Sequence, residues 1–304
     1  MTMITSLKEI SKLARKKGPK KLAVLAPEDE EFMRAVKISC DMGYIEPILI
    51  GDIKKMEDVA EKVEFKIDTY QKIPQVGQQA ISDLGISMVF SGELPIASKG
   101  QIPTSYIYRS IIREEAKAGS GMTVSVISFW EIPGIDHLVA FTDTGLNIKP
   151  NASVKEEIIK NAVFVFHLMG YTRPRIAVLS GQRGIGGTLD SYKDYEILKK
   201  SADAGVFGKC ELVSETSLME LFHGEKSNAG GRGDRIPHIL LVPCLDTGNI
   251  LCKLDFFLDV TRSSLVATSR GPVCIPSRSD FSDNIVQQLA MCVVLADEMG
   301  KEEH

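Results

Sequence analysis

Short apolar runs alternate with helical segments along most of the chain. The first run, residues 21–26 (KLAVLA), has the unbroken apolar character of a strand that is buried on both faces. Pro27-Glu-Asp-Glu then places proline in a first helical turn and acids near its positive end, and this helix should end near Gly43. Residues 47–50 (PILI) are typical of the next strand. This strand–helix–strand order predicts an α/β fold with a mostly parallel sheet.

The alternation continues to the last predicted helix. Strands are expected at 87–90, 124–129, 138–141, 175–180, 238–242, 265–268 and 272–275, with helices starting near Pro103-Thr104 and running over 154–169 and 282–299. Gly, Ser, Pro and charged residues predict loops at 91–102 and 224–236. A chain of 304 residues is long enough for two separate cores.

Composition argues against several classes of protein. A net charge of −4 gives no overall positive field for nucleic acid or anionic lipid, and the one basic cluster, residues 12–21, is best explained as a solvated helix end. The sequence has no apolar run of about 18 residues and no signal-peptide pattern, so we expect a soluble cytoplasmic protein. Six singly placed cysteines fit a reducing compartment, and five histidines without metal-ligand spacing predict no metal site.

Polar loops follow several of the predicted strands, where open α/β sheets bind their ligands. After one of them, Lys99-Gly100 and the helix that carries Arg109 could hold an anion, although Arg109 could equally be a plain surface residue. In residues 142–147 (TDTGLN), Asp143 and Asn147 could contact a ligand or cap the neighbouring backbone.

Two more loops carry groups that suit an anion or a reaction. The glycines of residues 181–188 would let backbone amides approach a phosphate, and Arg183 adds charge, but the loop lacks the GxxxxGK[ST] pattern and could be a flexible turn. Residues 277–280 (SRSD) place a hydroxyl, a guanidinium and a carboxylate at one strand-to-helix turn. That turn is either a catalytic grouping or a set of helix caps.

In this order, the segments resemble the phosphate acetyl/butyryl transferase family over nearly the whole chain. The TDxxxN and GNIxxK patterns are closer to its butyryl branch than to its acetyl branch. The matching segments are LAVLAPED (22–29), PILIGD (47–52), Lys99-Gly100 with Thr104 and Arg109, FTDTGLN (141–147), KEEI (155–158), PRIAVLS (174–180), TGNILCK (247–253) and SRSD (277–280).

The resemblance implies a two-domain α/β/α fold with mostly parallel sheets and an interdomain cleft, similar to isocitrate and isopropylmalate dehydrogenases. The first domain would comprise residues 1–150 and 266–304, and the inserted second domain residues 151–265. The implied reaction is acyl-CoA + phosphate = acyl phosphate + CoA, with a short acyl group such as butyryl or acetyl. It implies no metal or redox cofactor, no nucleic-acid or membrane partner, and a homodimer or a multiple of dimers.

The resemblance also assigns roles to residues. Arg109 and Arg278 would contact phosphate and the reacting carbonyl, and Ser277 would orient the thiol, with Asp280 or Asp283 as candidate bases. The remaining predicted substrate contacts are Lys99, Gly100, Thr104, Asp143, Asn147, Gly248, Asn249 and Asn284.

Two departures from the family pattern leave alternatives open. The acetyl branch has an aspartate seven residues after the serine, where this chain has Asn284, whose amide cannot accept a proton at neutral pH. Residues 210–218 (CELVSETSL) stand where the family usually has a Gly-Pro-Leu loop. One alternative is a non-catalytic or regulatory paralogue that binds CoA or acyl phosphate. Another is a metal-dependent hydroxyacid dehydrogenase of the related fold, but its clustered aspartates and nucleotide site are not found in the sequence.

Overall fold

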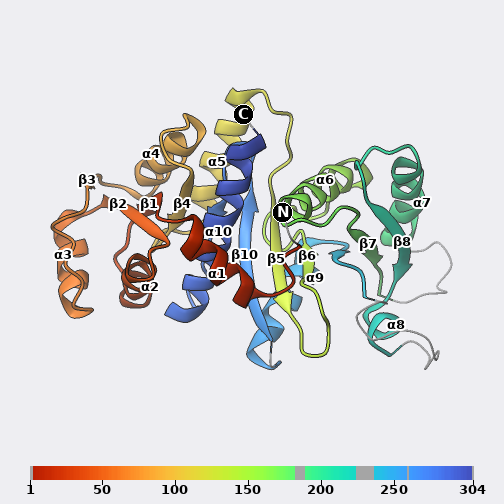
Figure 1. Ribbon diagram of the computed structural model, residues 1–304. Helices are drawn as coiled ribbons and strands as arrows, with labels where there is room; N and C mark the ends of the chain where they lie inside the picture. Colours follow the sequence, from red (N-terminus) through yellow and green to blue (C-terminus); the bar gives the residue numbers. More distant parts are fainter. Residues whose placement is uncertain (1–2, 182–188, 224–235, 259, 303–304) are drawn as a thin grey trace. The chain divides into compact units, whose positions relative to one another are not determined.

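The computed structural model of the chain describes residues 3–181, 189–223, 236–258 and 260–302 (Figure 1). The chain divides into two compact units: unit 1 comprises Met1–Leu7 and Ser125–Arg262, and unit 2 comprises Lys8–Val124 and Ser263–His304. This division differs from the predicted boundary at residue 150. The segment 125–150 falls in unit 1 because its hairpin, β5 (Ser125–Glu131) and β6 (Val139–Thr142), is joined through β6 to β9 (Ile239–Leu241).

The sheet of unit 2 is mostly parallel, as predicted. β1 pairs in parallel with β2 and β4, and β4 pairs in parallel with β11, whereas β10 is antiparallel to β11. The register places Lys99 opposite Leu25, and Ser98 opposite Cys274, so the carboxyl ends of β1, β4 and β11 lie together. The strand order is β3 (Lys72–Pro74), β2 (Ile45–Gly51), β1 (Lys20–Leu25), β4 (Ile96–Lys99), β11 (Val273–Cys274) and β10 (Thr261–Ala267).

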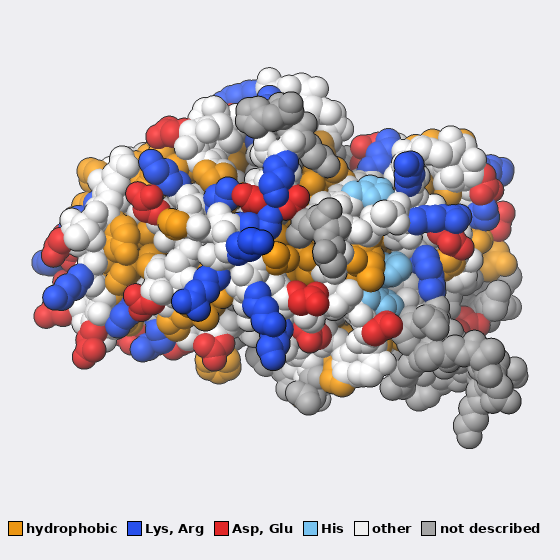
Figure 2. All heavy atoms as spheres, viewed as in Figure 1, with side chains coloured by type: hydrophobic (Ala, Val, Ile, Leu, Met, Phe, Trp, Pro, Cys, Tyr) orange, Lys and Arg blue, Asp and Glu red, His pale blue; other side chains and the backbone are white. Residues whose placement is uncertain are grey.

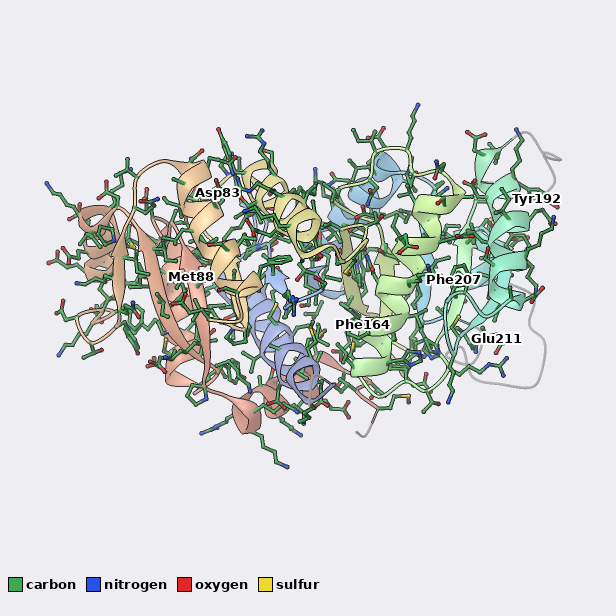
Figure 3. The ribbon with its side chains drawn as sticks, turned by 90° about the horizontal axis from the view of Figure 1, so that it is seen from above. Asp83, Met88, Phe164, Tyr192, Phe207 and Glu211 are labelled. Carbon is green, nitrogen blue, oxygen red and sulfur yellow. The ribbon has the colours of Figure 1, made fainter. Side chains whose placement is uncertain are left out.

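Helices cover both sides of the unit 2 strands. α4 (Gln78–Phe90) and α5 (Thr104–Ala118) lie on one side, and α10 (Ser282–Glu302) lies on the other with α2 (Glu30–Asp41) (Figure 3). Asp83 joins α4 to α5, since its carboxylate accepts a hydrogen bond from Ser110 at 2.6 Å and pairs with Arg113 at 2.8 Å. The chain also forms α1 (Leu7–Lys17) and α3 (Ile53–Lys62).

Local sequence explains where two of these helices begin. Asp29 precedes α2, and its carboxylate accepts a hydrogen bond from the Phe32 N–H at 2.9 Å. Asp52 caps α3 in the same way, by accepting from the N–H of Lys55. Side-chain oxygens at these positions satisfy amides that have no partner inside the helix.

Two predictions about residues 87–102 are wrong. The apolar run 87–90 is the last turn of α4 rather than a strand, and its buried Met88 and Val89 extend the buried face begun by Ile81. Three apolar residues fit either a strand or a helix, so periodicity alone could not decide. Within the predicted loop 91–102 lies β4, which is fully buried although it ends in Ser98 and Lys99. Lys99 therefore belongs to the end of a central strand.

Unit 1 has its own mostly parallel sheet, in the order β5, β6, β9, β7 and β8. β5 is antiparallel to β6, and the remaining pairs are parallel. Its apolar core includes Trp130, Phe141 and Leu240. The other elements are α6 (Ala152–Leu168), β7 (Arg175–Leu179), α7 (Asp190–Asp203), which carries Tyr192 in Figure 3, β8 (Glu211–Thr216), α8 (Leu218–His223), α9 (Leu245–Cys252) and η2 (Lys253–Phe256).

Charges of both signs are interspersed on the face seen in Figure 2, as the small net charge suggests. Part of the basic N-terminal cluster is engaged within unit 2. Lys17 pairs with both Asp297 and Glu298 on α10, and Lys20 pairs with Asp297 at 2.8 Å. Across the described ranges, none of the helices combines the length and the apolar character needed to cross a membrane.

We expect Asp297→Asn to lower the stability of unit 2 at neutral pH by about 1–2 kcal/mol. Partial burial opposes ionisation of Asp297, but hydrogen bonds from Lys17, Lys20 and Lys301 outweigh it and hold its pKa below the ordinary value. A carboxyl group whose pKa is lower in the folded state stabilises the folded protein fully at pH values above its unfolded-state pKa, which is about 3.9. This stabilisation is lost as the pH falls below that value toward the folded-state pKa. The denaturant midpoints of the two proteins should therefore differ at pH 7, and the difference should shrink as the pH falls below about 3.9. Asp190→Asn, at a side chain that is 95% exposed, is the control.

Candidate functional site

Three loops of unit 2 meet at a point where the strand order reverses. β1 leads through α2 to β2 on one side, whereas β4 lies on its other side. In doubly wound sheets such a switch point opens a crevice at the carboxyl ends of the strands, where ligands bind. The loops after β1 and β4 are joined here, since Gly100 N–H donates to the Leu25 carbonyl at 2.7 Å and Gln101 N–H donates to the Ala26 carbonyl at 2.9 Å.

Gly100 is required for this close approach. A Cβ atom at position 100 would lie 2.3 Å from the Ala26 carbonyl oxygen and 3.0 Å from the Phe32 ring. Ala26 itself has a φ of 47°, in a region that residues other than glycine seldom adopt. Gly100 thus lets two strand-end loops lie against each other.

A hollow at this point, here called the switch-point hollow, brings several predicted residues together. It holds about 20 Å³, room for about one water molecule, so a larger ligand would lie at its mouth. Ser277 and Arg278 are exposed there, whereas Lys99 and Asp280 are buried. The lining residues are Asp29, Phe32, Lys99, Gly100, Gln101, Pro276, Ser277, Arg278, Asp280 and Ile285.

Lys99 is the most unusual of these residues. Its side chain is 4% exposed, and among the described residues its ammonium group has no hydrogen-bond or ion-pair partner. Burial lowers the pKa of Lys99 to about 8; the charge of Arg278 also lowers it, while Cys274 and Asp280 act in the opposite direction. A buried cation without a counter-ion is costly. Lys99 is therefore expected either to bind an anion in the hollow or to lose its proton and become a neutral amine.

Asp280 holds the turn that presents Ser277 and Arg278. Its Oδ2 accepts a hydrogen bond from the Ser277 backbone N–H at 2.9 Å and another from Gln288 Nε2 at 2.8 Å. The Ser277 hydroxyl lies 3.0 Å from the hydroxyl of Ser279. Asp280 therefore fixes the backbone of this turn, and the side chains of Ser277, Arg278 and Ser279 stay exposed.

Four other predicted residues of unit 2 are not among the described residues that line the hollow. Arg109 is exposed on α5, where its Nη1 donates to Gln79 Oε1 at 3.0 Å and its guanidinium lies 5.6 Å from the centre of the Tyr106 ring. Thr104 is the first residue of α5. Asp283 is exposed and Asn284 is half-buried, both in the first turn of α10.

The predicted contacts of unit 1 form a compact turn. Asp143 is 2% exposed and accepts hydrogen bonds from the backbone N–H groups of Val126 at 2.9 Å, Gly145 at 3.0 Å and Asn147 at 2.7 Å. Asp143 thus makes the capping contacts that its sequence position allowed. Gly248, buried in α9, packs against this turn, since a Cβ there would lie 2.6 Å from the Asp143 carbonyl oxygen. Asn249 is exposed.

Unit 1 also has a hollow at the carboxyl ends of β7, β8 and β9 that the sequence did not reveal. It holds about 660 Å³, and its polar lining includes Ser180, Ser217, Glu220 and Thr247. Residues 210–218, which depart from the family pattern, form β8 and the start of α8, and recognising that strand would have pointed to Ser217 and Glu220. Gly181 lines this hollow, but the rest of the predicted phosphate loop, residues 182–188, and most of the predicted loop 224–236, residues 224–235, lie outside the described residues.

Fold and site together are those of a doubly wound α/β protein with a polar crevice at a switch point. The family model described as phosphate acetyl/butaryl transferase matches residues 78–293. Phosphate butyryltransferase of Clostridium acetobutylicum is 26% identical, covering 97% of this chain and 99% of that protein. Phosphate acetyltransferase of Thermotoga maritima is 27% identical, covering 95% and 99%. The crystal structure of a branched-chain phosphotransacylase from Enterococcus faecalis V583 covers 91% of this chain and 99% of its own, with a TM-score of 0.73 at 20% identity.

The chain belongs to the phosphate acetyl/butaryl transferase family, a family of acyltransferases, as its resemblance predicted. The family match covers β4, the switch-point hollow from Lys99 onward, and most of α10. Within the described ranges, no group of three or more His, Cys, Asp or Glu side chains is placed to hold a metal ion.

Proposed function

We propose that this chain transfers a short acyl group between coenzyme A and phosphate: acyl-CoA + phosphate = acyl phosphate + CoA. The observation that carries the proposal is the grouping of Lys99, Ser277 and Arg278 around one hollow at the switch point of unit 2. Named relatives in both the butyryl and the acetyl branch support a short acyl group such as butyryl or acetyl.

The proposed chemistry suits these groups. Phosphate reacts poorly with a thioester unless it is held close to the carbonyl carbon, and such positioning can lower the barrier by several kcal/mol. The exposed guanidinium of Arg278 can bind phosphate through two parallel hydrogen bonds and can stabilise the negative charge that develops on the carbonyl oxygen. The Ser277 hydroxyl, at the same mouth, can donate to that oxygen or orient the thiol.

A thiol-release assay tests the proposal. The purified chain is given acetyl-, propionyl-, butyryl- and branched acyl-CoA, with and without phosphate, and arsenate replaces phosphate in a third series. We expect thiol release that depends on phosphate or arsenate, with one acyl group preferred. Normal CoA binding without turnover of any acyl-CoA would instead favour the non-catalytic paralogue, which the amide at Asn284 supports.

Arg109 remains a proposed phosphate contact on the family resemblance. Its guanidinium is exposed, donates through Nη1 to Gln79, and has free donors to offer an anion as far as the described residues go. We expect Arg109→Ala to raise the KM for phosphate about tenfold with a smaller change in kcat, as the loss of one charged hydrogen bond implies. Initial rates over a phosphate series measure this, and an unchanged KM would remove Arg109 from the site. Arg113→Ala, one turn further along α5, is the control.

The remaining expectations accompany this function. The proposed substrate contacts stay Thr104, Asp143, Asn147, Gly248, Asn249 and Asn284, and Asp283 stays a candidate base. The interdomain cleft also stays a prediction. We propose a cytoplasmic homodimer or multiple of dimers, whose partners are its small-molecule substrates rather than nucleic acid or a membrane; six free cysteines fit a reducing compartment. The proposed reaction is an acyl transfer without oxidation or reduction, so no cofactor is expected.

A further inference from the structure

The proposed reaction needs a proton acceptor. In the direction of acyl-CoA formation, the CoA thiol must lose its proton to become a nucleophile, and a comparable thiol has a pKa of about 8.5. A base next to the thiol would accelerate this step by about 100-fold or more. The residue seven positions after Ser277 is Asn284, an amide, so the base must come from elsewhere in this chain.

The two neighbouring acids are poorly placed for the task. Asp280 is 7% exposed, and its Oδ2 already accepts hydrogen bonds from the Ser277 backbone N–H and from Gln288. A proton added to this carboxylate would weaken the two bonds that hold the turn. Asp283 is exposed on the first turn of α10 and is not among the described residues lining the switch-point hollow.

Lys99 meets the requirements that these acids do not. It lines the same hollow as Ser277 and Arg278, at the end of β4, and the residue is almost fully buried. Among the described residues, nothing accepts a hydrogen bond from its Nζ. An amine without a partner among the described residues, at the end of an almost fully buried residue and beside the groups assigned to the thiol and the phosphate, is available to exchange a proton with the reactants.

The geometry points to Lys99 as the proton acceptor for the CoA thiol, an inference that rests on the proposed function. The thiol proton passes to the neutral Nζ as the sulfur attacks the carbonyl carbon of the acyl phosphate. The new C–S bond forms, and the bond between the carbonyl carbon and the oxygen that bridges to phosphorus breaks. The electron pair of that bond leaves on the bridging oxygen, which becomes part of the departing phosphate. The resulting ammonium then returns the proton to the departing phosphate, so the neutral amine is restored.

The surroundings of Lys99 set the sign of the pH dependence. Burial first, and then the charge of Arg278, favour the neutral amine, which is the active form in this direction. With a pKa of about 8, roughly one amine in ten is neutral at pH 7, against roughly one in 2,500 for an ordinary lysine. The rate of acyl-CoA formation should therefore rise with pH and level off above about 8. The titratable or charged groups around the amine come from four places. They are Asp29, which caps α2, Cys274 of β11, Cys292 of α10 beside Cys274, and Arg278 and Asp280 of the loop after β11.

Chemical rescue of the full-length Lys99→Ala variant tests the inference. With butyryl phosphate and CoA as substrates, kcat should fall about 100-fold or more. Methylamine and less basic primary amines should restore part of the lost kcat. The pH at which the rate levels off should follow the pKa of the added amine. Tetramethylammonium, which carries the charge but accepts no proton, should restore nothing. Equal effects of methylamine and tetramethylammonium, or a Lys99→Ala rate within tenfold of the wild-type rate, would overturn the inference.

Lys99→Arg separates a base from a phosphate-binding cation. Arginine keeps the positive charge but does not lose its proton, so kcat should fall about 100-fold while the KM for phosphate in the opposite direction changes less than about threefold. Half or more of the wild-type kcat in this variant would overturn the inference. Circular dichroism and the thermal midpoint show whether the larger side chain fits, and if it does not, the rescue series decides. A wild-type chain without phosphate-dependent turnover would instead contradict the proposed function itself.

Discussion

Arg278→Ala should lower kcat/KM for phosphate-dependent cleavage of butyryl-CoA by about 100- to 1,000-fold. Arg278 is the exposed cation at the mouth of the switch-point hollow, so it can bind phosphate and stabilise the charge that develops during acyl transfer. Both the ground state and the transition state carry negative charge here, so KM for phosphate should rise and kcat should fall. Initial rates at varied phosphate and acyl-CoA concentrations measure the two effects.

Two further variants show which property of Arg278 is responsible. Arg278→Lys keeps the charge without the paired donors, so it should recover only part of the activity if the planar fork matters. Arg173→Ala removes a guanidinium that is 69% exposed in unit 1 and should leave the rates unchanged. Because Arg278 is exposed, its removal should shift the thermal midpoint little. Wild-type rates in Arg278→Ala across all acyl-CoA substrates would show that the assigned site is wrong.

Asp280→Ala should lower the free energy of unfolding more than Asp297→Asn does, and it should also lower the activity. The substitution leaves two donors without their acceptor, the buried Gln288 Nε2 and the part-buried Ser277 N–H. A buried donor without an acceptor costs about 1–3 kcal/mol and the part-buried one costs less, so we expect a total of about 2–4 kcal/mol. The freed turn would no longer hold Ser277 and Arg278 in place, and turnover should fall by about tenfold or more.

Denaturant midpoints and steady-state rates measure the two consequences of Asp280→Ala. Asp68→Ala, at a side chain that is 90% exposed in the same unit, is the control and should change neither. Asp280→Asn is informative because its amide keeps one acceptor oxygen, so it should lie between the alanine variant and the wild type. An unchanged midpoint in Asp280→Ala would mean that the turn is held by other contacts.

Much of the fold could be predicted because its signals are local. The apolar run at 21–26 and the acids after Pro27 indicate a buried strand and a helix, and the structure forms β1 and α2 there. Pro27 is not in the first helical turn, as was predicted, because α2 begins at Glu30 after the Asp29 cap. The last helix was equally clear from its length. The prediction for residues 87–90 is wrong because three apolar residues suit a strand as well as the end of a helix. Strand β4 is not evident in the sequence because Ser98 and Lys99 are polar although they are buried.

The candidate site was predictable in its members but not in its grouping. Glycine, arginine and serine at strand ends marked Gly100, Arg278 and Ser277 as candidates. Nothing in the sequence showed that Lys99 would be buried without a partner, because burial depends on loops that lie 70 or more residues away from it on either side. The same holds for Asp280, whose bond to Gln288 depends on how α10 packs.

The discontinuous course of unit 2 has a consequence for how the nascent chain matures. β4 leaves the ribosome early, but β11, which pairs with it, is translated only after the whole of unit 1. Until then one edge of β4 has no neighbouring strand, and unpaired edges invite association with other chains. The strands that lie wholly in unit 1 are translated before β11, and the last of them among the described residues is β9. The group formed by Lys99, Ser277 and Arg278 can therefore assemble only when synthesis of the chain is nearly complete, so the proposed acyl transfer is not possible before that point.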